Sequence, residues 1–132
     1  MKIDSQRVEV NAKASEIFEF LSYPKNIELL LPSDNIEDFK ATDKGCSFKV
    51  QGGITITLEQ DELIPHERIN MKSGENSPFP FTLSVIMDAQ DDKTHGYLAF
   101  DGEVNAFLKM MVQKPLTNLF NYMSGQLKER YE

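Results

Sequence analysis

The stretch NAFLKMMVQKPLTNLFNYMSGQLKERY, residues 105–131, decides the fold, because it is the only segment long and periodic enough to predict a full-length helix. Its large apolar residues recur at three- and four-residue steps, which places them on one stripe of the helix. Burying each of them stabilises the fold by roughly 1.5–3 kcal/mol, so we expect a partner surface to cover the stripe. The stripe comprises Val112, Leu116, Leu119, Phe120, Met123, Leu127 and Tyr131.

Pro115 lies inside this predicted helix. A proline lacks the backbone N–H and crowds the carbonyl group four residues earlier, at a cost of roughly 3 kcal/mol in a straight helix. We therefore expect a break or kink just before Pro115. Phe107, Met110 and Met111 then form a short, adaptable apolar cluster before the long part of the helix that follows Pro115.

Residues 33–104 change from helical spacing to alternation of apolar and polar side chains, with Gly, Pro, Asn and Asp between the runs. This pattern predicts an antiparallel meander with one apolar face and one solvated face. The apolar face needs a cover, and residues 105–131 are the only segment of matching length. The predicted strands are Asn35–Ala41, Ser47–Gln51, Ile54–Leu63, Glu67–Lys72, Phe81–Ala89 and Gly96–Val104.

The N-terminal part of the chain predicts a strand and two short helices. Residues 3–11 alternate in polarity, as a half-buried strand does. Residues 14–21 carry apolar side chains at helical spacing, and Pro24 stops the run. Residues 27–31 form a second compact apolar run, which predicts a short helix that cannot continue past Pro32.

The length of 132 residues fits one domain, residues 1–132. The net charge is −7 and no Lys/Arg cluster is present, so we expect no nucleic-acid partner. No run approaches the roughly 18 apolar residues that a membrane span needs, so we expect no stable membrane insertion. The single Cys46 and an N-terminus without a secretory signal favour a cytoplasmic location.

The charge is unevenly distributed along the chain. Residues 1–104 carry 10 basic and 19 acidic side chains, whereas residues 105–132 carry 4 and 2. One interpretation of the basic residues in the last helix is a solvated face with cations near the negative end of the helix dipole. The alternative is a patch for a protein partner or a membrane.

The order of these elements resembles the helix-grip fold of the START-like superfamily (SRPBCC), the broad group that includes Bet v 1 and the polyketide cyclase/dehydrase-like proteins. The resemblance rests on VEVNAKASEIFEFLSYP at 8–24, the Leu-Leu-Pro at 30–32, the Asp-Lys-Gly turn at 43–45, and the last helix with Pro115. It covers essentially the whole chain. It implies an α+β fold in which a curved seven-stranded antiparallel sheet wraps around the long C-terminal helix, with two short helices after the first strand.

The resemblance also implies a cavity between the sheet and the last helix that holds a hydrophobic or amphipathic small molecule or a lipid. We expect a pocket of order 300–1,000 Å³, the usual range for small-molecule sites. The predicted ligand-binding residues are Met110, Met111, Leu116 and Phe120 on the helix, and Met71, Phe81, Leu83, Leu98 and Phe100 on the sheet.

The activity stays open, because this superfamily shares its shape more than its chemistry. A non-catalytic binding module is the first hypothesis, with no cofactor. The alternatives are a polyketide cyclase/dehydratase-like enzyme and a protein-interaction domain with a filled core. The enzyme needs a titratable group inside the cavity, and Tyr97, His95 or Glu103 meets that need only if the strand phase shifts by one residue.

No residue is assigned a catalytic or metal-binding role. His66 and His95 fall at predicted turns and are expected to be exposed. The acidic residues around His66 lack the ligand spacing of a metal site such as HExxH. Cys46 follows a turn glycine, with no neighbouring base to lower its pKa.

Overall fold

The computed structural model describes residues 1–50 and 53–132. Within this part of the chain, one antiparallel sheet has the strand order β1-β8-β7-β6-β5-β4-β3, and β2 pairs with the same β8. The strands are β1 (Lys2–Asp4), β2 (Val8–Val10), β3 (Ile36–Ala41), β4 (Gly45–Val50), β5 (Ile54–Ile64), β6 (Arg68–Ser73), β7 (Phe81–Gln90) and β8 (Lys93–Gly102). The helices are α1 (Ala14–Leu21), the 3₁₀ helix η1 (Pro24–Leu30) and α2 (Ala106–Arg130).

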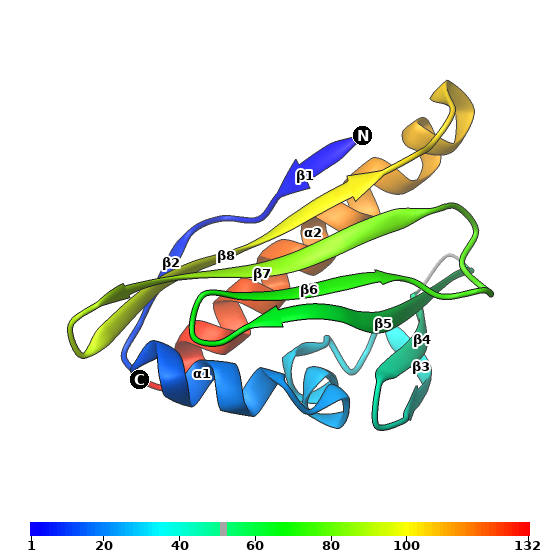
Figure 1. The fold of residues 1–132 in the computed structure, drawn as a ribbon. Coiled ribbons are helices and arrows are strands. Elements are labelled where there is room, and N and C mark those ends of the chain that lie inside the picture. The colour runs from blue at the N-terminus through cyan, green and yellow to red at the C-terminus, as the bar shows by residue number, and fades with distance from the viewer. Residues whose placement is uncertain (51–52) are drawn as a thin grey trace.

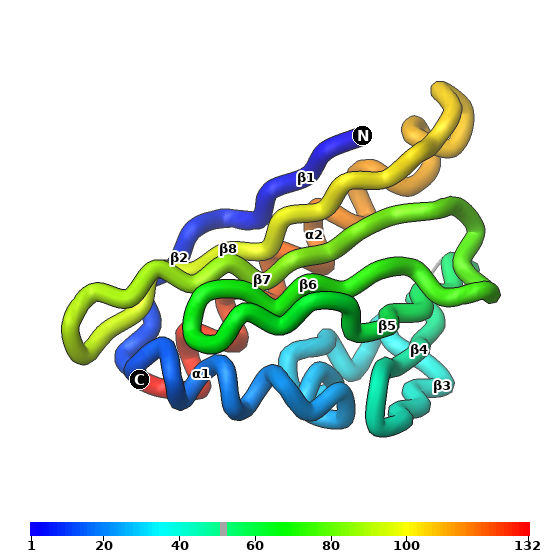
Figure 2. Tube along the Cα trace, in the orientation of Figure 1, coloured from blue at the N-terminus to red at the C-terminus, as the bar shows by residue number. Residues whose placement is uncertain are grey.

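The sheet grips α2, as the sequence predicts. Figures 1 and 2 show α2 lying along one face of the sheet, with its C-terminal end beside α1. The meander from β3 to β8 follows the predicted strands to within a few residues. Gln51, the predicted last residue of one strand, lies outside the described residues.

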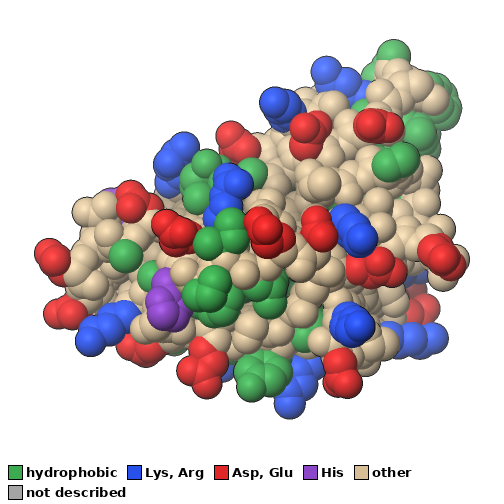
Figure 3. Space-filling view, viewed as in Figure 1, with side chains coloured by type: hydrophobic (Ala, Val, Ile, Leu, Met, Phe, Trp, Pro, Cys, Tyr) green, Lys and Arg blue, Asp and Glu red, His purple; other side chains and the backbone are tan. Residues whose placement is uncertain are grey.

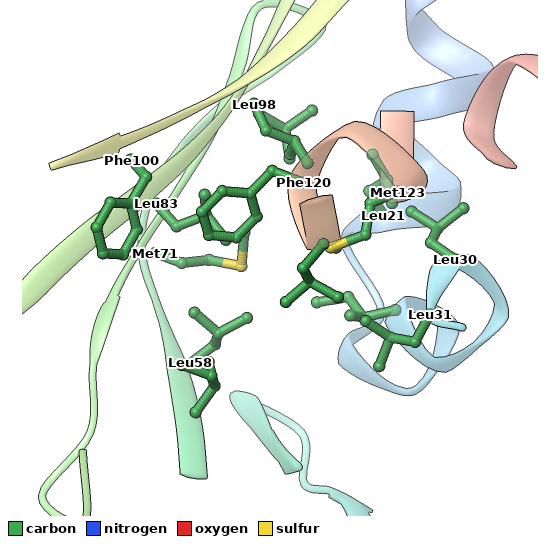
Figure 4. Packing of buried hydrophobic residues seen from close by; sticks show 14 of the residues in the cluster. Leu21, Leu30, Leu31, Leu58, Met71, Leu83, Leu98, Phe100, Phe120 and Met123 are labelled. Carbon is green, nitrogen blue, oxygen red and sulfur yellow. The ribbon is translucent and has the colours of Figure 1, made fainter. Parts of the chain in front are cut away.

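The helical stripe that decides the fold is buried. Val112, Leu116, Leu119, Phe120, Met123 and Leu127 are each at most 7% exposed, and Tyr131 is half-buried. The facing side of the sheet contributes the alternate residues of β5 to β8, and α1 and η1 close one end of the core (Figure 4). The predicted phase of both helix and strands is therefore correct.

Of the break or kink predicted before Pro115, the break is wrong, because α2 continues through Pro115 from Ala106 to Arg130. Pro115 deprives the carbonyl group of Met111 of its helical donor. Met111 is 58% exposed, so solvent can replace that hydrogen bond. At the start of the helix, the Asn105 side chain accepts a hydrogen bond from the Leu108 N–H at 2.8 Å and caps the first turn.

The predicted first strand, residues 3–11, is divided into β1 and β2. Asp4 pairs with Ala99 and Val8 with Gly96, so the N-terminal side has one more residue than β8 over this interval. Such an insertion is a β-bulge. The buried Ser5 completes it, because its hydroxyl group accepts the Leu98 N–H at 2.9 Å while its own N–H donates to the Leu98 carbonyl at 2.8 Å.

Candidate functional site

A small cavity lies between the sheet and the C-terminal half of α2. Its volume is about 20 Å³, which is room for roughly one water molecule. The lining residues come from the sheet, α1, η1 and α2, and they are mainly apolar: Val8, Leu21, Ile27, Leu30, Leu58, Ile69, Met71, Val85, Gly96, Tyr97, Leu98, Met123, Ser124 and Leu127. The structure therefore contains a small apolar void, and the predicted pocket of 300–1,000 Å³ is not open.

Two small residues account for the position of this void. Gly96 is buried on β8, where the neighbouring inward positions carry Thr94 and Leu98. Ser124 is 3% exposed on α2, and its hydroxyl group donates to the Asn121 carbonyl within the same helix at 3.0 Å. Because both residues border the cavity, the sheet and the helix each leave volume unfilled there.

A second hollow opens to the surface beside Pro115. This groove has a volume of about 490 Å³ and is lined by Pro32, Asn35, Val50, Lys114, Pro115, Asn118, Leu119 and Tyr122. Leu119 is buried and precedes Met123, which borders the cavity, by one helical turn. The groove and the cavity are therefore neighbours along α2.

The predicted ligand-binding residues fall into three groups. Met71 and Leu98 border the cavity. Phe81, Leu83, Phe100, Leu116 and Phe120 are buried in the packed core and are not among the cavity residues. Figure 4 shows Leu83, Phe100 and Phe120 in this packing. Met110 and Met111 are 85% and 58% exposed, so they lie on the surface instead of roofing an interior space.

Aromatic packing fills the end of the core where the pocket was expected. The Phe100 ring centroid lies 5.3 Å from that of Phe81 and 5.3 Å from that of Phe120. Phe79, outside the predicted strands, is 5% exposed and its ring packs edge-on against Phe100 at 6.3 Å. Sequence analysis missed Phe79 because it lies in a loop before Pro80, where alternation gives no signal.

The ionisable side chains do not converge on the cavity. His66 lies in a turn, as predicted, with φ 66°. His95 was also predicted in a turn, which is wrong, since it lies within β8. Its Nε2 is 3.1 Å from Glu9 Oε2, and Lys93 Nζ is 3.3 Å from Glu9 Oε1. These hydrogen bonds, first that with His95 and then that with Lys93, hold the pKa of the exposed Glu9 below its usual value.

The remaining candidate groups are not placed for acid–base chemistry in the cavity. Tyr97 borders the cavity, but its ring lies under the Arg7 guanidinium group, 4.2 Å from ring centroid to carbon. Glu103 is exposed. Cys46 is buried, and this burial raises the pKa of its thiol to about 12. Among residues 1–50 and 53–132, no group of three His, Cys, Asp or Glu side chains is arranged to hold a metal ion. None of the described helices is long and apolar enough to cross a membrane.

No protein-family model and no curated protein matches the chain. Solved structures do match it. TTHA0849 from Thermus thermophilus has a TM-score of 0.77 at 12% identity, covering 99% of this chain and 97% of that one. A START superfamily protein from Mycobacterium smegmatis has a TM-score of 0.73 at 14% identity, covering 98% and 96%.

A further likeness is to the protein XoxI from Bacillus cereus, with a TM-score of 0.71 at 11% identity over 98% of this chain and 94% of that one. At such identities the likeness concerns the fold alone, which hosts many activities. The chain has the fold of the START superfamily, in which an antiparallel sheet grips a long C-terminal helix.

Proposed function

We propose that the protein binds a hydrophobic or amphipathic small molecule, or a lipid, between the sheet and α2, without catalysing a reaction. The observation that carries this proposal is the small apolar cavity that lies one helical turn from the open groove at Pro115. START-superfamily folds typically hold apolar ligands in this part of the molecule, which supports the same assignment.

Binding requires the interior to expand, and the side chains at the cavity suit that requirement. Met71 and Met123 border the void, and methionine changes rotamer at low cost because its chain is unbranched. Rotation of Leu119 and Met123 would join the groove to the cavity. Of the predicted ligand-binding residues, Met71 and Leu98 would then contact a ligand first. Only a longer ligand would reach the aromatic cluster of Phe81, Phe100 and Phe120.

A passive role is favoured by the surroundings of the ionisable groups. An acid–base catalyst must lie within hydrogen-bond reach of the reacting atom. His95 is paired with Glu9 on an exposed surface, and the Cys46 thiol keeps its proton at neutral pH. A ligand in the cavity would therefore meet carbon and sulfur atoms and few polar groups.

Titration with an apolar fluorescent probe tests the proposal, together with native mass spectrometry of the gently purified protein. Ser124→Leu adds apolar volume at the cavity wall, whereas Ser15→Leu makes the same change at an exposed position of α1. We expect the wild type and Ser15→Leu to bind the probe alike, and Ser124→Leu to lose at least about ten-fold in affinity. Circular dichroism melts show whether each variant is folded.

A second function, a protein-interaction domain with a filled core, is favoured by the small cavity volume of about 20 Å³. It predicts that the wild type takes up no probe and retains no co-purifying mass. That result would overturn ligand binding. Probe uptake that Ser124→Leu leaves unchanged would place the site elsewhere, with the open groove the next candidate.

A further inference from the structure

The start of α2 exposes a cluster of three large apolar side chains. Phe107, Met110 and Met111 are 70%, 85% and 58% exposed, and we call these three residues the apolar tip. They are separated by three and four residues, so they share one face of the helix. Val112, at 4% exposure, packs against the core on another face. Hydrophobic side chains gather at this end of the molecule, where α2 begins (Figures 1 and 3).

The positive charges of the helix are complementary to an anionic partner. From Asn105 to Lys128 the chain has no Asp or Glu, although the protein carries 21 of them. Lys109 lies within the same first turns, and Lys114 lies one turn beyond Met110 and Met111 on the same face. Among the described residues that line the groove beside Pro115, Lys114 is the only charged one.

The size of the apolar tip argues against a second copy of the chain as its occupant. The three side chains expose on the order of 400 Å², taking roughly 200 Å² for each large side chain. A stable protein–protein interface needs about 800 Å² on each partner. An area of roughly 300–600 Å² is instead typical of the largest apolar patch on a monomer, and such a patch is often functional.

We propose that the apolar tip docks on the surface of a lipid bilayer that contains anionic lipids. Phe107, Met110 and Met111 insert among the acyl chains near the headgroups, and Lys109 and Lys114 lie at the level of the lipid phosphates. Apolar residues flanked by cations bind the membrane interface in this way without spanning it. Glu103 is exposed two residues before the cap of the helix, and its charge opposes the attraction of Lys109 and Lys114 to the bilayer. Charges farther than about 8 Å from the tip are largely screened at physiological ionic strength.

This docking would bring the mouth of the groove to the membrane surface, since Lys114 belongs to both. Membrane docking goes beyond the proposed ligand binding, and separate experiments test the two proposals. Probe uptake in vesicle-free solution measures the cavity, whereas vesicle binding measures the apolar tip. A protein that takes up the probe but ignores vesicles would contradict only the docking.

A tryptophan reporter gives the sharpest test, because the chain contains no tryptophan. Met110→Trp places the reporter at the apolar tip, and Leu29→Trp places it at a 53% exposed apolar position in η1. Vesicles of phosphatidylcholine with phosphatidylglycerol should shift the Met110→Trp emission to the blue, and brominated lipid should quench it. Leu29→Trp should respond to neither. An unchanged Met110→Trp emission would overturn the proposal.

Vesicle flotation tests the same contact without a reporter. We expect the wild type to float with phosphatidylcholine/phosphatidylglycerol vesicles, to bind phosphatidylcholine vesicles at least ten-fold less, and to dissociate as salt rises. Phe107→Ser/Met110→Ser should lose binding, whereas the control Tyr23→Ser/Leu29→Ser should keep it.

Charge reversal supplies the second pair of variants. Lys109→Glu/Lys114→Glu should bind at least ten-fold less than Lys40→Glu/Lys49→Glu, which has the same net charge and changes two exposed lysines of the sheet. Equal loss in the two variants would show that only overall charge matters and would overturn the docking. A dimer in analytical ultracentrifugation that Phe107→Ser/Met110→Ser dissolves would also overturn it, in favour of a second copy.

Discussion

The backbone N–H of Gln6 donates to the side-chain oxygen of Asn121 at 2.7 Å, which ties the bulge between β1 and β2 to the middle of α2. The Gln6 side-chain amide also lies 3.4 Å from the Asn121 carbonyl oxygen. Because the bulge leaves Gln6 out of the strand ladder, its N–H needs another acceptor. The edge of the sheet is therefore attached to the helix by a polar clip as well as by apolar packing.

Asn121→Ala should destabilise the protein by about 0.5–1.5 kcal/mol, the usual net value of a hydrogen bond. The helical periodicity alone places Asn121 on the polar face and predicts a silent substitution, whereas the hydrogen bond from Gln6 predicts a cost. Urea denaturation measures the change. The control is Asn118→Ala on the exposed face of the same helix, which should stay within about 0.5 kcal/mol. Equal losses of stability in the two variants would show that the contact between Gln6 and Asn121 does not stabilise the protein.

Leu116→Ala and Phe120→Ala should each cost about 2–5 kcal/mol, as large-to-small substitutions in a packed core do. Leu116 is 0% and Phe120 3% exposed, whereas Met110 on the same helix is 85% exposed. Met110→Ala should therefore change stability by less than about 0.5 kcal/mol. Thermal melts compare the three variants, and a cost for Met110→Ala similar to that of Leu116→Ala would mean that the apolar tip is covered in solution.

Leu83→Trp should destabilise the protein by about 1–3 kcal/mol or more, because it inserts volume into a filled region. Leu83 is 2% exposed and does not border the cavity. An open pocket at this position, as the sequence suggests, would instead tolerate the larger side chain. A melting temperature equal to that of the wild type would show that the aromatic end of the core opens in solution.

Gly125→Ala should stabilise the protein by about 1 kcal/mol, since glycine inside a helix costs about that much relative to alanine. A Cβ atom at Gly125 would meet only Gln6 Nε2, at 3.7 Å. Gly45→Ala is the contrasting variant, because its Cβ atom would overlap the Leu58 carbonyl oxygen. We expect Gly45→Ala to lower the melting temperature, and a rise in that variant would contradict the close approach of β4 and β5.

Stability should fall at alkaline pH through Cys46. Burial raises the pKa of its thiol from 9.0 to about 12, so between these values the unfolded chain loses the proton while the folded chain keeps it. The contribution is fully present below pH 9 and decreases as the pH rises towards 12, by at most about 1.4 kcal/mol per pH unit. Urea melts across this range should show a shallower fall for Cys46→Ala. Identical slopes would indicate that the thiol is accessible in the folded state.

Local patterns were sufficient for the elements of this fold. The three- and four-residue spacing from Val112 to Leu127 predicted the buried face of α2, because a helix repeats every 3.6 residues whatever its partner. Alternation predicted the phase of the meander in the same way, so that Leu98 and Phe100 face the core as expected. These features are determined by residues close together in the sequence. The order of the elements that they predict is what resembles the START-superfamily fold.

The location of unfilled space was beyond the reach of such patterns. A void depends on side-chain volumes that meet from distant parts of the chain, and here Gly96 and Ser124 leave one at the C-terminal half of α2, whereas Phe79, Phe81, Phe100 and Phe120 fill the other end. The clip between Gln6 and Asn121 joins residues 115 positions apart. The sequence by itself determined which residues face inwards, because that follows from local periodicity. Only the tertiary structure decided where the core leaves a void and that Met110 and Met111 face solvent, because both depend on which side chains from distant parts of the chain meet the helix.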